Sequence, residues 1–513
     1  MILIHTEASL SVNSEQFTVF EVSAYSRKCR TLSWVERFGR HASRFLIPAD
    51  KRESLKSVHT RWVPAFVGMT RGWSRNRSNQ GFAMRAGFGR EPMARTMKKE
   101  NTEPASPGNL RESPGLKWIV FSLVCAAFTT VYITQPVLPV IRAEFHVSET
   151  RASWTIAAVV LGMALSNLPF GMLSDRYPLR PIILTGGATV ASAGFLCAAT
   201  SSLAVLVGAR FVQGLFLPSL TTCLAAYLAR SLPPASLNVV MGTYVSATVA
   251  GGLGGRLLGG WIHPPLHWRF AFVSASLMLL GATLAAVKRL PGNGPVRPAD
   301  TPAAGFLRLL SRKEFLRIYL VAFGGFFAFS SVFNYLPFYL SGSPFGASTE
   351  LITLLYLSYT VGMVVGPLAG KVSNSIGNGN TMILGAGILG LSIVATLIPS
   401  LLLIIVSLVG ICIGFFAVHA SAAGSLNRKL TGNQGRANSL YVLFYYLGGA
   451  VGIYLSGHAY ALWGWAGVVG VTVSMLVIPL ATGAAERREV GRALRKAGPL
   501  WMRSVQGSGL RKR

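Results

Sequence analysis

The stretch GMLSDRYPLR, residues 171–180, joins two long apolar segments of the chain. It places Gly171, the pair Asp175 and Arg176, and then Arg180 at fixed spacing. Each flanking segment reaches the length of about 20 apolar residues that is needed to cross a bilayer. A short charged segment between two such runs predicts a tight turn at a membrane surface.

A second stretch, GKVSNSIG at residues 370–377, has the same spacing between its first glycine and its turn. Asn374 stands at the position that corresponds to Asp175, and Gly377 stands where the first copy has Pro178. Because the pattern occurs twice, we interpret the chain as two related halves.

The composition is that of a polytopic membrane protein. Of the 513 residues, 51% are hydrophobic and 13% are charged, and the mean hydropathy is +0.47. Soluble domains carry about 25% charged residues. The net charge of +30 would suit nucleic-acid binding, but the basic residues lie in the first hundred residues, in loops and in the tail. Membrane orientation explains this distribution better, so we expect no nucleic-acid partner.

Apolar runs of membrane-spanning length indicate twelve helices, six before and six after a basic linker at 288–317. The first six runs cover about residues 116–140, 153–173, 180–199, 203–229, 239–262 and 269–287. The second six cover about residues 318–341, 350–370, 381–398, 400–426, 437–460 and 462–484. We therefore expect an all-α membrane protein with twelve transmembrane helices, arranged as two parallel six-helix repeats at 116–287 and 318–485.

The ends of the chain carry separate expectations. Residues 1–115 are basic and contain neither a spanning run nor a signal-peptide apolar region, which predicts an N-terminal extension without a stable fold. Residues 62–72 resemble the translated intergenic repeats of over-extended bacterial gene models, and Met97 is a candidate start of translation. Residues 486–513 form a short basic tail.

The loops predict that both termini are cytoplasmic. This arrangement places a large set of basic residues inside: Arg176, Arg180, Arg230, Lys288, Arg289, Arg297, Arg308, Arg312, Lys313, Arg317, Lys371, Arg428, Lys429 and Arg436. It leaves only Arg142, Arg151 and Arg269 outside. The excess of basic residues in cytoplasmic loops is what the positive-inside rule requires.

The charged turn resembles the loop between helices 2 and 3 of the major facilitator superfamily, G-x-x-x-D-R-x-G-R-K. Gly171, Asp175, Arg176 and Arg180 match this motif, and Pro178 replaces its second glycine. The resemblance implies two six-helix halves about an axis along the membrane normal, with the substrate held between them near the midplane. It also implies that the aspartate and the arginines stabilise one of two conformational states through ion pairs at the cytoplasmic helix ends.

The fifth span resembles the antiporter signature G-x8-G-x3-G-P-x2-G-G of drug-efflux members. Its matching residues are Gly242, Gly251, Gly255, Gly259 and Gly260, with Arg256 in place of the signature proline. Gly251, Gly255 and Gly259 lie four residues apart, so they share a helix face that a neighbouring backbone can approach closely. Kinship with antiporters is one interpretation of this pattern, and generic packing of small residues is the other.

Arg256 lies near the centre of this span, where a guanidinium group costs about 2.5–3.5 kcal/mol on insertion scales. It should therefore face a partner or a wet cavity rather than lipid. Two interpretations stay open: Arg256 binds an anionic group of the substrate, or it contacts a carbonyl or phosphate group near the membrane surface.

Arg210 and Gln213 of the fourth span resemble the family motif R-x-x-Q-G. In the family this arginine faces the central cavity and is implicated in proton coupling, so the resemblance predicts a cavity position for Arg210. Snorkelling of Arg210 toward the outer membrane surface is the alternative. Gln213 is three residues away and shares the face of Arg210.

Further polar residues are candidates for the cavity. Tyr132 and Gln135 lie three residues apart in the first span, before Pro136, and Asn334 of the seventh span aligns with Gln135 in the repeat. Polar groups at matching depths in both halves suit a site near the midplane. His419 is a further candidate, with simple packing as the alternative.

The sequence also limits the mechanism. No Asp or Glu lies inside the predicted spans, so a proton carrier would have to be another group: His419 or His458, which titrate in the useful range, or Glu144 or Glu350 at the outer mouth. There is no P-loop, which excludes ATP-driven transport by this chain alone. The cysteines lie at no ligand-like spacing, and no enzyme motif is present, so we expect no metal, no cofactor and no enzymatic activity.

The resemblance implies a monomeric secondary transporter in the lipid bilayer of a bacterial inner membrane. It would export a small organic solute, such as a drug, sugar or metabolite, by alternating access in exchange for protons. An importer or uniporter of an organic anion is the alternative, because the embedded fixed charge is basic. A non-transporting sensor is a further alternative, but the tail is too short for a recognisable output module.

Overall fold

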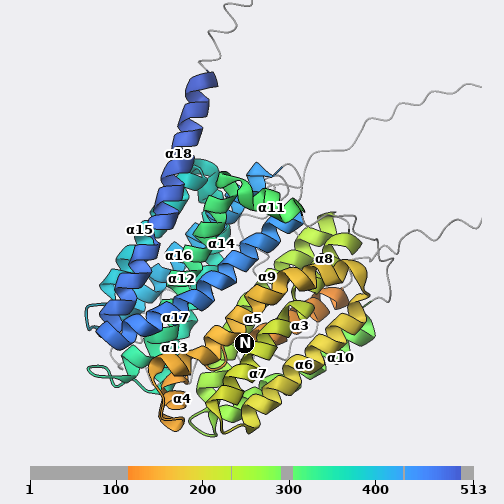
Figure 1. Ribbon diagram of the computed structural model, residues 1–513, viewed down its shortest axis with the longest axis vertical. Coiled ribbons are helices and arrows are strands. Elements are labelled where there is room, and N and C mark those ends of the chain that lie inside the picture. Colours follow the sequence, from red (N-terminus) through yellow and green to blue (C-terminus); the bar gives the residue numbers. More distant parts are fainter. Residues whose placement is uncertain (1–113, 233, 291–303, 431–433, 498–513) are drawn as a thin grey trace, which may run out of the picture. The chain divides into compact units, whose positions relative to one another are not determined.

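The computed structural model describes residues 114–232, 234–290, 304–430 and 434–497, all within one unit. Every regular element in these ranges is a helix (Figure 1). The predicted N-terminal extension, residues 1–115, lies outside the described residues except for its last two. The middle of the predicted linker and the end of the predicted tail lie outside them as well.

Two successive sets of helices build the unit. The first set is α3 (Pro114–Val131), α4 (Leu138–Glu144), α5 (Glu149–Arg176), α6 (Leu179–Ala199), α7 (Leu203–Leu220), α8 (Thr222–Ser231), α9 (Pro234–Ile262) and α10 (Trp268–Arg289). The second is α11 (Ala304–Ser311), α12 (Lys313–Ser341), α13 (Thr349–Leu355), η2 (Tyr356–Ser358), α14 (Tyr359–Ile376), α15 (Asn378–Ala395), α16 (Leu401–Lys429), α17 (Gln434–Met475) and α18 (Val477–Ala497).

The helices of the two halves pack in the same pairwise pattern. In the first half α3 packs against α9, α5 against α7, and α6 against both α7 and α10. In the second half α12 packs against α17, α14 against α16, and α15 against both α16 and α18. Helices in corresponding positions along the chain therefore have corresponding neighbours, which is the arrangement of parallel repeats.

The first predicted span is broken at its outer end. α3 ends at Val131 and α4 begins at Leu138. Pro136 and Pro139 lack a backbone N–H and clash with the preceding turn of a helix, which accounts for the break. The non-helical segment between the two helices contains Tyr132 and Gln135.

The number of spans is less clear in the structure than in the sequence. Nine helical stretches in the described ranges are long and apolar enough to cross a membrane, and the last of them is Gly435–Arg492. That stretch contains non-helical backbone at Trp463 and Gly464, close to the predicted boundary between the last two spans. The apolar helix Gly115–Val131 is shorter. The count of twelve therefore stays a prediction.

Glycines bring α9 into contact with the first span. A Cβ atom on Gly255 would lie 2.1 Å from the carbonyl oxygen of Thr129, and Gly251 and Gly259 approach the same segment as closely. Gly448 of α17 meets the backbone of α12 in the same way. A side chain at these positions would collide with backbone, so the helices can pack this closely only because the glycines have none.

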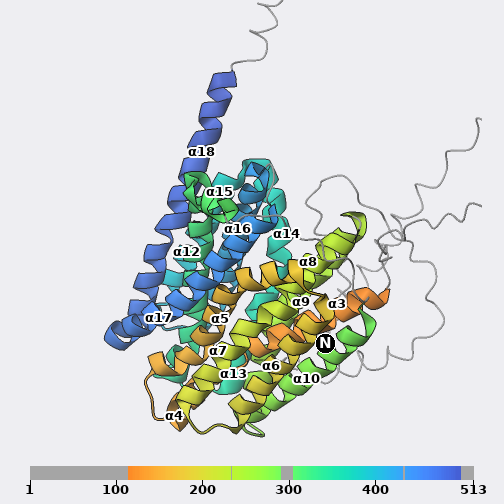
Figure 2. The ribbon, with the colours of Figure 1, turned by 45° about the vertical axis from the view of Figure 1, so that its right-hand side comes forward.

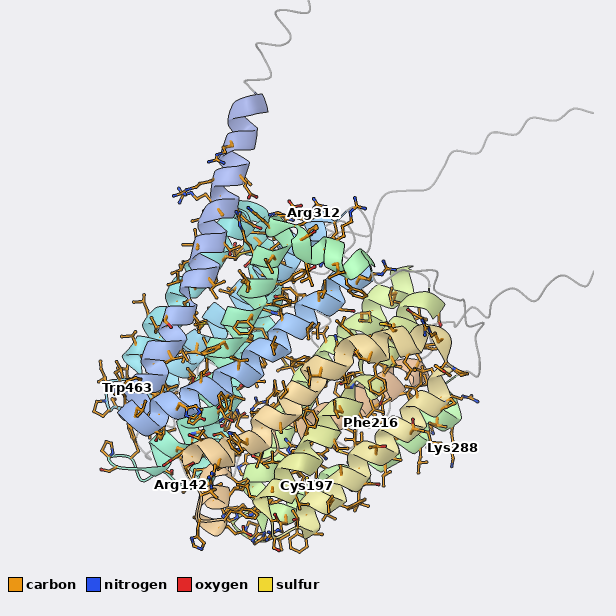
Figure 3. All side chains as sticks on the ribbon, in the orientation of Figure 1. Arg142, Cys197, Phe216, Lys288, Arg312 and Trp463 are labelled. Atoms are coloured by element: carbon orange, nitrogen blue, oxygen red, sulfur yellow. The ribbon has the colours of Figure 1, made fainter. Side chains whose placement is uncertain are left out.

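The two halves meet along α5 and α17, and α13 contacts α9 (Figures 1 and 2). Arg312, predicted to be cytoplasmic, and Arg142, predicted to be external, lie at opposite ends of the described unit (Figure 3). We call these the Arg312 end and the Arg142 end.

Candidate functional site

A cavity of about 1180 Å³ lies between the two halves. Its wall is formed mainly by α5, α8 and α9 of the first half and by α12, α14, α16 and α17 of the second. A volume of this size, shared between two repeats, is large enough for a small organic molecule.

The cavity is open toward the Arg312 end. Its lining there includes Asp175 and Arg176 in the last turn of α5, Arg436 in the first turns of α17, and Phe306 of α11. Arg256 of α9 lies deeper in the lining. It is 15 residues along α9 from the mouth residue Met241, which corresponds to about 22 Å of helix.

Contacts between the halves close the other end. The Asn334 side chain donates to the Ser153 hydroxyl at 2.8 Å, and the Thr150 hydroxyl donates to the Gly457 carbonyl at 2.9 Å. A Cβ atom on Gly260 would lie 1.8 Å from the Thr353 hydroxyl oxygen, so α9 and α13 touch directly. On α9, Gly260 lies four residues beyond Arg256, toward the closed end. Arg256 is therefore at the floor of the cavity.

Arg256 is 3% exposed, and neutral acceptors surround its guanidinium group. Nε donates to the Gln135 side-chain oxygen at 2.7 Å, and one terminal nitrogen donates to the Gly252 carbonyl at 2.6 Å. The other terminal nitrogen donates to the Tyr359 hydroxyl at 3.0 Å. Because Tyr359 begins α14, this last bond joins the two halves.

Three tyrosine rings enclose the same group. The guanidinium carbon lies 4.0 Å from the ring centre of Tyr132, 4.1 Å from that of Tyr359 and 5.4 Å from that of Tyr356. Cation–π attraction of this kind stabilises a desolvated cation. The rings and the neutral acceptors together explain how an arginine is kept at this depth without a carboxylate partner.

An aromatic wall continues from this group into the second half. The ring of Phe329 packs edge-on against Tyr359, with 5.3 Å between centres, and stacks on Phe415 at 4.0 Å. The His419 ring stacks on Phe415 at 5.9 Å, and its Nδ1 lies 3.0 Å from the Tyr441 hydroxyl. All of these residues line the cavity, so His419 takes the position expected of a cavity residue.

Arg210 does not line the cavity, contrary to the expectation from the R-x-x-Q-G resemblance. Its side chain is 0% exposed, so it does not snorkel to the membrane surface either. It donates to the carbonyl oxygens of Thr130, Val131 and Thr155. The last carbonyls of a helix lack partners within that helix, and Arg210 satisfies those at the end of α3.

Gln213 and Asn334 are also outside the cavity lining. Gln213 accepts from Arg210 at 2.7 Å and donates to the Val190 carbonyl at 3.1 Å, which ties α7 to α6. Asn334 joins the halves at the closed end. Of the aligned pair Gln135 and Asn334, only Gln135 lines the cavity, where it accepts from Arg256.

The residues of the charged turn lie at the cavity mouth and beside it. Gly171, Asp175 and Arg176 line the cavity. Arg180 instead donates to the Leu290 carbonyl at the end of α10, from Nε at 2.9 Å and from a terminal nitrogen. These bonds cap the C-terminal end of α10.

The glycines of the antiporter-like pattern have different surroundings. Gly251, Gly255 and Gly259 contact the first span, and Gly260 contacts α13 of the other half. Gly242 has no neighbour within 4 Å of a built Cβ atom. The glycines of this pattern therefore have three kinds of surroundings: three pack within the first half, one contacts the other half, and one has free space around it.

Sequence reasoning did not identify Tyr356 and Tyr359. Both occur in an apolar run that otherwise resembles a lipid-facing helix, and neither has a partner nearby in sequence. Their proximity to Arg256 depends on how the halves meet. The only sequence signal for a site in this segment was weak: two tyrosines and a serine lie close together at residues 356–359.

The charge of the cavity is mainly positive. Among the described residues of its lining, the charged side chains are Asp175, Arg176, Arg256 and Arg436, and the aspartate is at the mouth. Glu144 lies outside the lining and forms an ion pair of 2.6 Å with Arg269. The described residues contain no group of three or more side chains that could hold a metal ion.

Comparisons with known proteins agree with this architecture. The family model described as Major Facilitator Superfamily matches residues 120–452. The uncharacterized MFS-type transporter YybF of Bacillus subtilis is 27% identical over 72% of this chain and 93% of its own. The inner membrane transport protein YnfM of Escherichia coli is 29% identical over 72% of this chain and 90% of its own.

A solved structure has the same fold. It is a bacterial homologue of the human lysosomal transporter Spinster, in an inward-facing and unoccupied conformation. It superposes with a TM-score of 0.58 at 17% identity, covering 73% of this chain and 96% of the other. With a family model that spans most of the chain and a cavity between its two halves, this chain belongs to the major facilitator superfamily of membrane solute transporters.

Proposed function

We propose that the chain is a secondary transporter that exports a small organic solute from the bacterial cytoplasm by alternating access. The observation that carries this proposal is the cavity between the halves, open at the Arg312 end and closed at the Arg142 end. If the Arg312 end is cytoplasmic, as the positive-inside rule predicts, the described conformation is inward-facing and takes its solute from inside.

We propose exchange with protons as the energy source. The glycine pattern of α9 supports this through its likeness to the antiporter signature. The described part of the cavity contains no carboxylate apart from Asp175 at the mouth, which leaves His419 as the titratable group deep in the wall. Tyr441 beside it can pass a proton to or from the ring nitrogen.

A second candidate is an importer or uniporter of an organic anion. Arg256 favours it, because this buried cation faces the solute space without a carboxylate partner among the described residues. The two candidates differ in direction and in coupling but use the same cavity.

Inside-out vesicles that contain the full chain would test the proposal. A pH-sensitive dye reports an imposed proton gradient while labelled sugars, organic acids and lipophilic drugs are added one at a time. We expect one class of solute to accumulate and to dissipate the gradient. Solute exchange without any proton movement would favour the anion uniporter, and no movement of any solute would contradict both candidates.

Asp175→Ala serves as the loss-of-function control in the same vesicles. Because Asp175 is at the mouth, in the turn that we expect to switch between states, its loss should abolish export while the protein still inserts into the membrane. Unchanged export by this variant would contradict the role of the charged turn.

A further inference from the structure

We infer that the solute is a small carboxylate with an aromatic body, and that Arg256 binds its carboxylate group. This inference rests on the proposed function, because it names the substrate class of the same cavity. It follows from the hydrogen bonds that Arg256 leaves unmade, from the rings beside it and from the charge of the cavity.

The Arg256 guanidinium has hydrogen-bond donors that are not used within the protein. A guanidinium group carries five N–H groups, and three have acceptors: Gln135, the Gly252 carbonyl and Tyr359. Each terminal nitrogen makes one of these bonds and bears two hydrogens, so one N–H remains on each. Two donors on the two terminal nitrogens match the two oxygens of a carboxylate, the bidentate geometry in which arginine binds such groups.

The second buried arginine of the described chain shows what a purely structural role looks like. Arg210 makes four hydrogen bonds, all to groups of its own half, and does not reach the cavity. Arg256 makes fewer bonds, one of them to the opposite half, and lies on the cavity floor. The difference indicates that Arg256 is held ready for a ligand.

The surroundings hold the guanidinium in place before the solute arrives. Tyr132 and Tyr359 lie close to it, at 4.0 and 4.1 Å from their ring centres, and Gln135 fixes Nε. A donor pair that needs no rearrangement binds a planar anion with less loss of entropy. Because these tyrosines are uncharged, they would not repel a carboxylate.

The aromatic part of the inference comes from the wall next to this group. Phe329 touches Tyr359 and stacks on Phe415, and Phe326 stacks on Tyr445 with 3.8 Å between ring centres. A ring attached directly to the bound carboxylate would lie against these side chains. Aromatic rings pack together through offset or edge-on contacts and exclude water from the charged pair.

The charge of the cavity disfavours other solutes. A cationic drug would meet Arg256 with no carboxylate near it, because Asp175 is the acid of the described lining and lies at the mouth. A sugar would need many hydrogen-bonding groups, whereas this part of the wall is built from rings. A neutral aromatic molecule would leave the two free N–H groups of Arg256 without acceptors.

Equilibrium binding to the purified full-length protein tests the inference with four probes. Benzoate, benzamide and benzylamine share one ring and differ in charge, and hexanoate shares the charge but has no ring. We expect benzoate to bind at least about tenfold more tightly than the other two aromatic probes. Hexanoate should bind severalfold more weakly than benzoate.

Variants locate the binding group. Arg256→Gln should weaken benzoate binding about 10- to 100-fold and leave benzamide binding nearly unchanged. Arg256→Lys keeps the charge but loses the paired donors, so its affinity should lie between the two. Arg142→Gln is the control: it removes an arginine that lies outside the cavity lining, with a side chain 51% exposed, and should change benzoate affinity less than about twofold.

Several results would overturn the inference. They are equal or tighter binding of benzamide or benzylamine, binding of no probe at all, or undiminished benzoate binding to Arg256→Gln. Hexanoate binding as tightly as benzoate would overturn the aromatic part. If Arg256→Gln does not fold, the ranking of the probes on the unchanged protein and the Arg256→Lys variant still decide.

The vesicle assay separates failure of this inference from failure of the proposed function. Transport of a sugar or a cationic drug without charge-selective benzoate binding would overturn the substrate class and leave the transporter in place. Charge-selective benzoate binding without movement of any solute would support the anion site and contradict transport.

Discussion

Two buried arginines in the same half have opposite surroundings. Arg210 donates four hydrogen bonds within its own half, three of them to backbone carbonyls, and Arg256 has neutral partners and two unused donors on the cavity floor. Burying a guanidinium group costs free energy unless its donors are satisfied. For Arg210, hydrogen bonds within its own half offset this cost. For Arg256, we infer that hydrogen bonds to a bound ligand offset part of it.

Replacement of Arg210 tests its structural role. Arg210→Gln should lower the free energy of unfolding by about 3 kcal/mol or more, because three buried carbonyls at the end of α3 and in α5 lose their donor. Thermal unfolding in detergent measures the change. Arg142→Gln, whose side chain is 51% exposed and pairs with Glu149 at 3.2 Å, should cost less than about 1 kcal/mol. A stable Arg210→Gln protein that cannot transport would instead favour a functional role for this arginine.

At the scale of the helix, α9 combines packing and function on different faces. One face carries the glycines that meet the first span, and another carries Arg256 into the cavity. The close approach of the two helices brings Gln135, in the non-helical segment after α3, within hydrogen-bonding distance of Arg256. The glycine face therefore sets the position of the arginine.

Identical substitutions at two glycines of α9 should have opposite effects. Gly255→Ala places a Cβ atom 2.1 Å from the Thr129 carbonyl oxygen and should destabilise the protein by about 1–3 kcal/mol. Gly242→Ala meets nothing within 4 Å and should stabilise α9 by up to about 1 kcal/mol through helix propensity. Unfolding temperatures in the same detergent compare them. Shifts of the same sign and size would contradict the packing argument.

At the scale of the whole unit, the halves contact each other along α5 and α17, and the cavity between them opens at one end. Asn334 and Thr150 make hydrogen bonds across the Arg142 end, and the cavity opens at the Arg312 end. Alternating access requires that the closed end can open, so the contacts there must be few and individually weak. The hydrogen bonds of Asn334 and Thr150 are each of the modest strength that this requires.

Loss of the Asn334 side chain should loosen the closed end. In Asn334→Ala the bond to Ser153 is lost, at a cost of about 1 kcal/mol, and amide hydrogen exchange in α13 should quicken about fivefold. Exchange in α15 and α16, which do not cross between the halves, should stay unchanged. Ser407→Ala is the control, because this buried hydroxyl in α16 has no hydrogen-bond partner. Equal exchange in both variants would show that the bond does not hold the closed end.

The sequence by itself determined the membrane class and the family. Apolar length, the repeated charged turn and the glycine spacing are properties of contiguous residues, so they can be recognised without knowing what packs against what. The glycine face of α9 was predicted for the same reason: residues four apart on a helix always share a side. Tyr132, Gln135 and His419 were predicted to be cavity residues, and they line the cavity in the structure.

Only the tertiary structure decided which arginine faces the cavity and what surrounds it. Arg256 and Tyr359 are 103 residues apart, and Arg256 and Gln135 are 121 apart. The contacts of Arg256 with these two residues depend on the rotation of α9 about its axis and on how the two halves pack against each other. Arg210 lies on α7, and its side chain bonds to the end of α3 and does not line the solute space. The chain specifies these orientations through the packing of many distant side chains, and no local pattern encodes them.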